Sequence, residues 1–334
     1  MALKGFALTY DFGDAAAEAR ACRTDCALFD FSFLECARLE GRRARSVLEA
    51  FTGRSMVALR QNEILYALRT GPTGEVATDW TVWRTGAEGF EVMSGRREDV
   101  LDLLACAGPG VEVVDATMGR AVFAVQGPGA LDVLCKLGDV RPIEFLRYFT
   151  FGRAQLAGIA CTIGRLGFTG EAGFEIVVER RNASELWQVL SARAAPAGFI
   201  AADLLRIEAG FVLFTNEFRL PVSAREAGLG KFGRPPDQQR PKIRLVSFRA
   251  KADQLSYPWQ PSHDLQRPLG PGTIAVTSAC KSVVADGILG LGYVATGTAP
   301  GTALKDTSGT FRDIHLTSKP FYDIAKRRPR APWR

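Results

Sequence analysis

The 334-residue chain is longer than one compact core usually is, so two or three domains are expected. Hydrophobic residues make up 47% and charged residues 23%, as in ordinary globular proteins, and no stretch reaches the roughly 20 apolar positions that span a bilayer. The N-terminus lacks the apolar core of a secretory signal, so we expect a cytoplasmic protein, and the formal net charge of +6 favours acidic partners.

Cysteine and histidine are poorly placed for metal or triad chemistry. The seven cysteines show no CxxC spacing, and Cys22 and Cys26 have no second pair that would complete a metal set. Several cysteines are flanked by apolar residues, so buried reduced thiols are expected. Because His263 and His315 are the only two histidines, we expect no metal site, and catalysis that relies on carboxylates and on binding.

The first part of the chain predicts helices that alternate with short strands. The turn sequence Thr70-Gly-Pro-Thr-Gly74 separates two strands and favours an antiparallel meander. In chain order, the spacing of apolar residues predicts a helix over 12–27, strands over 27–33 and 35–41, a helix over 42–51, the meander over 63–94, a helix over 98–106, a strand over 121–125 and a helix over 130–137.

The second part changes character at a Pro-rich polar linker. Before the linker, strands are expected over 146–180 and a helix over 183–196. After it, short strands separated by Gly and Pro indicate a small β-barrel. The chain is therefore expected to be α+β, with an α+β body of two intertwined subdomains over 1–240 and a β-barrel over 241–334.

The basic run Lys326-Arg-Arg-Pro-Arg330 is the one candidate for nucleic-acid binding. It is interpreted as a solvated, frayed tail, because no basic motif interleaved with aromatic residues accompanies it. Nucleic-acid and membrane partners are therefore not expected.

Three charged residues stand out from these patterns, although each has an ordinary structural explanation. Glu175 in a strand could be an exposed charge. Asp79 lies between Thr and Trp in a strand, where Asp is disfavoured. Arg206 interrupts an otherwise apolar helix and could mark the edge of its buried face.

Eight segments in chain order resemble the glycine cleavage T-protein, or aminomethyltransferase, family, and the resemblance runs nearly end to end. It implies a three-domain aminomethyltransferase-type fold with a C-terminal β-barrel and with tetrahydrofolate bound in a central hole. The segments are Leu28-Phe-Asp-Phe-Ser32, Ala124-Val-Gln-Gly-Pro128, Arg165 to Ile176, Asp203 to Gly210, Asn216-Glu217 followed by Glu226 to Gly230, Val276-Thr-Ser278, Leu291-Gly-Tyr-Val294 and Pro320 to Asp323.

The resemblance also implies roles for four residues. Glu175 would accept paired N–H donors of the pterin edge. Asp79 would lie near the folate nitrogens and orient or deprotonate them, as the catalytic group. Arg206 would support this carboxylate network or meet a carboxylate of the folate tail. Phe168, which replaces the family's Tyr, would pack on the pterin without its hydroxyl.

The departures from the family pattern lie where the donor would bind. Thr78 replaces an Asp, Ala279-Cys-Lys281 follows the V-T-S motif, and the segment before Leu28 is short. The expectation is a tetrahydrofolate-dependent transferase (demethylase type) that takes a methyl or methylene group from a small methylated or aminomethyl donor.

Two alternatives stay open. One is the glycine cleavage aminomethyltransferase itself, which uses a lipoylated carrier protein. The other is a folate-binding iron–sulfur assembly or regulatory module without turnover, although the hallmark K-G-C-Y-x-G-Q-E is absent from the comparable segment Ala224 to Lys231. A partner dehydrogenase subunit is a further expected partner, since related domains are fused to flavin-dependent enzymes.

Overall fold

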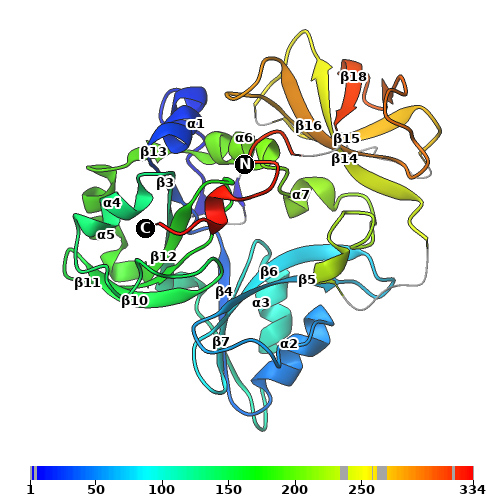
Figure 1. Ribbon diagram of the computed structural model, residues 1–334. Coiled ribbons are helices and arrows are strands. Elements are labelled where there is room, and N and C mark those ends of the chain that lie inside the picture. Colours follow the sequence, from blue (N-terminus) through cyan, green and yellow to red (C-terminus); the bar gives the residue numbers. More distant parts are fainter. Residues whose placement is uncertain are drawn as a thin grey trace.

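The computed structural model describes residues 2–3, 6–233, 240–257, 259–261, 269–317 and 320–333. Most of the Pro-rich linker and His263 lie outside these residues. Figure 1 shows three lobes, each built on a sheet, arranged around a common centre. Apart from the sheets, a short hairpin pairs β1 (Ala2–Leu3) with β2 (Phe6–Ala7), and 3₁₀ turns occur at Thr117–Gly119, Arg180–Asn182, Gly230–Phe232 and Arg328–Arg330.

The first lobe is a six-stranded sheet in the order β10-β11-β12-β9-β3-β13. All neighbours are antiparallel except β13 and β3, which run parallel. Its strands are β3 (Ala27–Asp30), β9 (Arg120–Gln126), β10 (Phe151–Leu156), β11 (Ile159–Gly164), β12 (Gly173–Glu179) and β13 (Ala195–Ala197), and its helices are α1 (Ala15–Thr24), α4 (Ala130–Cys135), α5 (Ala183–Ser191) and α6 (Phe199–Glu208).

The second lobe is a five-stranded sheet in the order β5-β6-β7-β4-β8. It contains the predicted meander, and α2 and α3 contribute to its core. Its elements are β4 (Glu35–Glu40), α2 (Ala44–Thr52), β5 (Ile64–Thr70), β6 (Val76–Arg84), β7 (Gly89–Ser94), α3 (Arg97–Leu104) and β8 (Glu112–Asp115).

The third lobe is a curled five-stranded sheet in the order β17-β15-β16-β14-β18, and a bridge between Leu304 and Ile314 links its two edges. The expected fold class is therefore confirmed: an α+β chain with a C-terminal sheet of half-barrel form. The strands are β14 (Ile243–Lys251), β15 (Thr273–Lys281), β16 (Ile288–Ala295), β17 (Lys305–Asp306) and β18 (Arg312–Thr317); the short helix α7 (Phe214–Glu217) leads toward them.

Several predicted boundaries were wrong for local reasons. The helix expected over 12–27 begins only after Asp14, whose carboxylate accepts the N–H groups of Ala16 and Ala17 as an N-cap. The strand region 146–180 is interrupted by a loop over 165–172, which contains the Thr-Gly-Glu motif and Gly170 at φ 81°. Strands β8 and β13 were missed because each has at most four residues, too few to show a periodicity.

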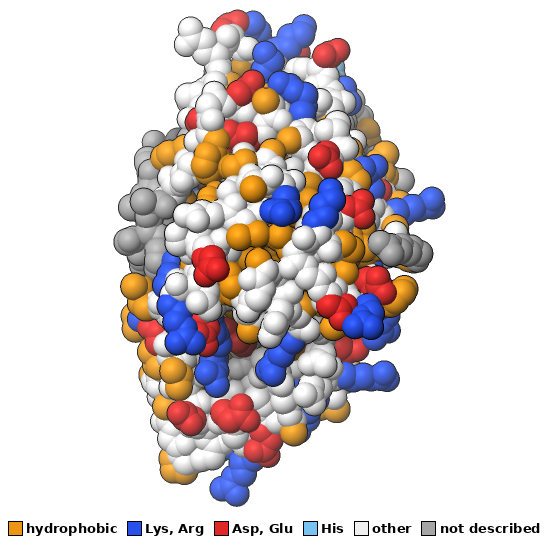
Figure 2. All heavy atoms as spheres, turned by 90° about the vertical axis from the view of Figure 1, so that its left-hand side faces the viewer, with side chains coloured by type: hydrophobic (Ala, Val, Ile, Leu, Met, Phe, Trp, Pro, Cys, Tyr) orange, Lys and Arg blue, Asp and Glu red, His pale blue; other side chains and the backbone are white. Residues whose placement is uncertain are grey.

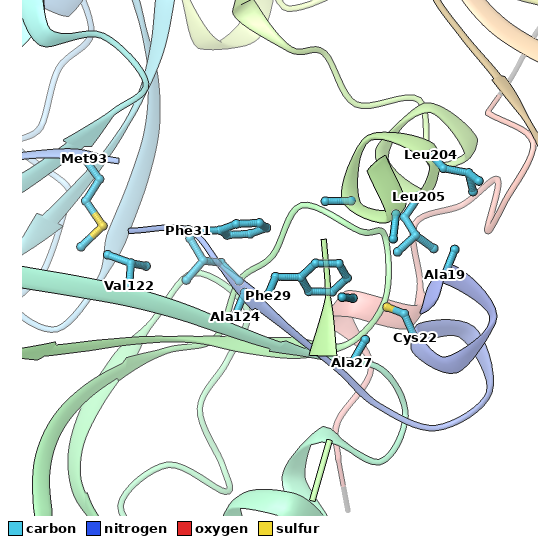
Figure 3. Packing of buried hydrophobic residues seen from close by; sticks show 14 of the residues in the cluster. Ala19, Cys22, Ala27, Phe29, Phe31, Met93, Val122, Ala124, Leu204 and Leu205 are labelled. Carbon is cyan, nitrogen blue, oxygen red and sulfur yellow. The ribbon is translucent and has the colours of Figure 1, made fainter. Parts of the chain in front are cut away.

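A hydrophobic core joins the first lobe, including α6, to the second lobe. Figure 3 shows Phe29 and Phe31 between Met93 of β7 and Leu205 of α6. The two phenyl rings stack with their centroids 5.8 Å apart. Because this core lies at the junction of the lobes, it fixes which faces of the two sheets look toward the centre.

Candidate functional site

Asp79 lies on the face of β6 that is turned toward the centre. Burial alternates along this strand: Thr78 and Trp80 are fully covered, whereas Asp79 and Thr81 are half-buried. On the neighbouring strand, the Tyr66 hydroxyl donates a hydrogen bond to the Asp79 carboxylate. Burial raises the pKa of Asp79 to about 6, and the bond from Tyr66 opposes that rise. The group can thus gain or lose a proton near neutral pH.

Glu175 lies on the first sheet, in the middle of β12. Its register neighbours are Ala124 of β9 and Gly164 of β11, so its side chain leaves the sheet on the same face as these two small residues. The side chain is only 7% exposed, and within the described part of the chain it has neither a hydrogen-bond donor nor a cation as partner. Burial raises the pKa of Glu175 to about 7. A buried carboxyl of this kind is costly unless a ligand supplies donors.

Trp83 connects the two walls of the site, which are the second-lobe sheet that carries Asp79 and the first-lobe sheet that carries Glu175. It lies four residues beyond Asp79 on the same side of β6, about 13 Å along the strand. Its ring packs directly on Gly164, since a Cβ on that glycine would lie 2.2 Å from the indole. Gly164 is in register with Glu175. The walls therefore meet at Trp83, and both carboxylates face the space beside it.

Aromatic rings and cations form another side of this region. Phe168, in the loop after β11, stacks on Phe211 with centroids 6.3 Å apart and an interplanar angle of 15°. The Lys326 ammonium lies 4.2 Å from the centroid of Phe211. Burial and the positive charges of Arg330 and Lys231 together lower the pKa of Lys326 to about 8. Lys326 thus lies beside Phe211, while Lys231 lies over Phe232 and Arg330 over Tyr148.

Arg206 lies beneath Phe211 and is completely buried. Nε and Nη2 lie 2.8 Å from Asp203, and Nη1 lies 2.8 Å from Glu217. Nη1 also donates to the carbonyl of Phe211 at 3.0 Å, and Nη2 donates to the Ser278 hydroxyl at 2.6 Å. Arg206 thus ties α6 to α7 and β15 and holds the backbone at Phe211.

A second buried ionic network was missed by the sequence analysis. Glu171 of the Thr-Gly-Glu motif forms ion pairs with Arg23 of α1 at 3.1 Å and with Arg328 at 2.8 Å. The Tyr322 hydroxyl donates a hydrogen bond to the same carboxylate. Arg23 also forms an ion pair with Glu208 of α6, at 2.9 Å. Charge pairs between such distant positions leave no local sequence signal.

The basic C-terminal segment, residues 320–333, is not a frayed tail, so that interpretation was wrong. Arg165 donates to the carbonyl groups of Pro329 and Ala331, and Trp333 stacks on Phe174 at 5.3 Å. Figure 1 shows this segment, in red, crossing the front of the first lobe. These contacts bring Lys326 and Arg330 to the candidate site.

Comparison with known proteins places this geometry in a family. The model of the GCVT N-terminal domain matches residues 4–234. An aminomethyltransferase of Saccharopolyspora erythraea is 30% identical over 337 residues, which cover 93% of this chain and 90% of that protein. The chain belongs to the aminomethyltransferase family. An aminomethyltransferase of Halothermothrix orenii is 27% identical over 311 residues, covering 87% and 86% of the two chains.

A solved structure supports the same fold. The glycine cleavage system aminomethyltransferase T of Bartonella henselae superposes with a TM-score of 0.79 at 22% identity, covering 97% of this chain and 94% of that one. Membership of the family assigns the chain to the one-carbon transferases, which confirms the expected enzyme class. Within the described residues, no helix is both long and apolar enough to cross a membrane.

Proposed function

We propose that the protein is a tetrahydrofolate-dependent one-carbon transferase that acts on a small methylated or aminomethyl donor. The observation that carries the proposal is the buried carboxylate of Glu175, which has no partner among the residues that the structure describes and lies where the family motif ends in Gly-Phe-Glu. A carboxylate accepts two parallel N–H donors well, and the pterin edge of a folate offers such a pair. A ligand of the folate type would thus offset the free-energy cost of burying the Glu175 carboxylate.

The aromatic rings of the candidate site fit a flat, aromatic ligand. Phe168 and Phe211 present nearly parallel rings, and Trp83 bounds the space between the two walls. Bound tetrahydrofolate supplies a nitrogen nucleophile for the one-carbon unit. Arg206 acts as a positioning residue in this proposal, because it holds Phe211 and two acidic neighbours and its guanidinium is fully covered.

Asp79 is proposed as the catalytic group. Its pKa of about 6 lets the carboxylate accept a proton near neutral pH, and Tyr66 fixes its orientation. The remaining catalytic effect comes from holding two reactants together, which is worth up to roughly 7–11 kcal/mol in favourable cases. Thr78 does not face this space, since it lies on the covered side of β6. The departure from the family pattern at Thr78 therefore lies on the covered face of the second lobe, away from this space.

The proposed function is tested by incubating the protein with tetrahydrofolate and a panel of methylated amines, ethers and sulfonium compounds. Mass spectrometry is expected to detect 5-methyl- or 5,10-methylene-tetrahydrofolate with at least one donor. Turnover that appears only after a lipoylated carrier protein is added would favour the glycine cleavage reaction. Failure to bind tetrahydrofolate would contradict the proposal, and binding without turnover of any donor would favour a regulatory or assembly module.

Glu175→Gln is expected to weaken tetrahydrofolate binding by about 10- to 150-fold, the value of a charge-assisted hydrogen-bonded pair. The folded-state pKa of about 7 lies above the ordinary value of 4.5, so the apo protein loses stability as pH rises from about 4.5 to 7. A ligand that donates N–H groups binds the ionised form. Wild-type affinity should therefore rise about tenfold between pH 6 and 8, whereas the variant should show little change.

Isothermal titration calorimetry in buffers of different ionisation enthalpy measures both the affinity and the accompanying proton release. Glu179→Gln is the matched control, since Glu179 is exposed at the other end of the same strand. A pH-independent wild-type affinity, or equal affinities of Glu175→Gln and Glu179→Gln, would remove Glu175 from the ligand site.

A further inference from the structure

A separate pocket opens where β3 leaves the first sheet. Its cavity volume is about 430 Å³, within the range of small-molecule sites. Residues 8–12 form one side of it, and the first turns of α5 and α6 form the other. The pocket shares neither Asp79 nor Glu175 with the candidate site, and no role described above accounts for it.

Aromatic rings dominate the lining of this pocket. Phe12 is 50% exposed and stacks on Trp187 with centroids 6.3 Å apart. Phe33 meets Phe199 edge to face, also at 6.3 Å. Half-covered rings that border a cavity attract cations through their faces, and methylated ammonium groups suit such cages because they are both charged and apolar.

Charges of both signs accompany the rings. The Asp30 side chain is exposed, with Oδ1 accepting the Ser32 N–H at 2.9 Å, and no cation pairs with it in the described ranges. Arg180 also lines the cavity, as does Ser184 in the first turn of α5. A helix N-terminus and a guanidinium together favour a carboxylate. Figure 2 shows that the side of the molecule carrying α5 presents hydrophobic side chains among Lys, Arg, Asp and Glu.

We propose that this pocket binds a small zwitterion that carries a methylated ammonium group and a carboxylate. The ammonium group lies between the aromatic rings and Asp30, and the carboxylate faces Arg180 and α5. A purely anionic ligand would meet the charge of Asp30, and a purely cationic one would meet that of Arg180. An N-methylated amino acid satisfies both.

The pocket is continuous with the wall that holds Glu175. Phe29 and Phe31 line the pocket and also belong to the core at the junction of the lobes. Phe29 is in register with Ala124, which is in register with Glu175. The further assignment of the pocket as the place of the methylated donor rests on the proposed function, whereas binding of the zwitterion stands on the pocket itself.

The test is isothermal titration calorimetry of the full chain with glycine betaine. Glycine lacks the methyl groups, choline lacks the carboxylate, and 3,3-dimethylbutyrate replaces the ammonium by carbon. Glycine betaine is expected to bind at least about tenfold more tightly than each of the three. Absence of glycine betaine binding, or equal binding of 3,3-dimethylbutyrate, would overturn the proposal.

Two variants locate the binding. Trp187→Leu should weaken glycine betaine about tenfold, and Asp30→Asn, which keeps the acceptor for Ser32, about three- to fivefold. The controls Phe145→Leu and Asp132→Asn alter exposed side chains elsewhere and should bind as wild type does. If Asp30→Asn and Trp187→Leu both bind like their controls, the ligand lies elsewhere and the assignment fails.

Tetrahydrofolate is titrated in parallel with the same proteins. All four variants are expected to keep wild-type tetrahydrofolate affinity. If the wild-type protein does not bind tetrahydrofolate, the proposed function is contradicted. Glycine betaine binding that depends on Asp30 and Trp187 would still support the assignment of the pocket. The two failures are therefore distinguishable.

Discussion

Asp79→Asn is expected to lower the rate of one-carbon transfer by about 10²- to 10⁴-fold while tetrahydrofolate affinity stays near that of the wild type. The amide oxygen can still accept the Tyr66 hydrogen bond, so the geometry of β5 and β6 is retained. It cannot take up a proton, however, and that is the role proposed for Asp79. Single-turnover kinetics measure the rate, and calorimetry measures the affinity.

Tyr66→Phe gives an independent check on the same group. The Tyr66 hydrogen bond lowers the pKa of Asp79 against the effect of burial, so its removal should raise that pKa above about 6. The acidic limb of the pH–rate profile should then move to higher pH while the plateau rate changes less. An Asp79→Asn protein with wild-type turnover would show that the carboxylate has no part in the transfer.

Arg206→Met is expected to lower the free energy of unfolding by about 3–5 kcal/mol, because it leaves two buried carboxylates without their cation. Burial already raises the pKa of Asp203, and Arg206 opposes that rise. Without Arg206 the folded-state pKa would rise further, so the loss of stability should be larger at pH 7.5 than at pH 5. Urea unfolding at the two pH values measures this difference.

Arg141→Met is the control for this variant. The Arg141 side chain is 83% exposed and pairs with Asp139 at 2.5 Å on the surface, where ion pairs contribute little. The free energy of unfolding of Arg141→Met should stay close to that of the wild type. If Arg206→Met lowers the free energy of unfolding no more than this control does, water or local rearrangement stabilises the carboxylates of Asp203 and Glu217 in place of Arg206.

The strand pattern of the second lobe was predictable because its residues alternate in burial. In β6, the period of two residues of a strand puts Thr78 and Asp79 on opposite faces, and the structure shows this arrangement. Glu175 could be singled out from its motif. That its carboxylate is buried without a donor or cation could not be predicted, because burial of a strand residue depends on elements far away in sequence. Here those elements include Ala124, Gly164 and the packing of Trp83.

The cationic side of the site could not be predicted for the same reason. A run of Lys and Arg beside Pro is typical of a solvated tail. What orders it is a set of partners more than a hundred residues away, among them Glu171, Arg165 and Phe174. The aromatic pocket had no signal either, because its rings come from separate segments and are brought together only by the end of β3 meeting two helices.

The network around Glu171 has a consequence for how the molecule is made. Glu171 joins Arg23, near one end of the chain, to Tyr322 and Arg328, near the other. During synthesis the first lobe can fold when its strands have emerged. Lys326 and Arg330 take their places beside Phe211 and Tyr148 only afterwards. We therefore expect the body to fold before the ligand site is complete.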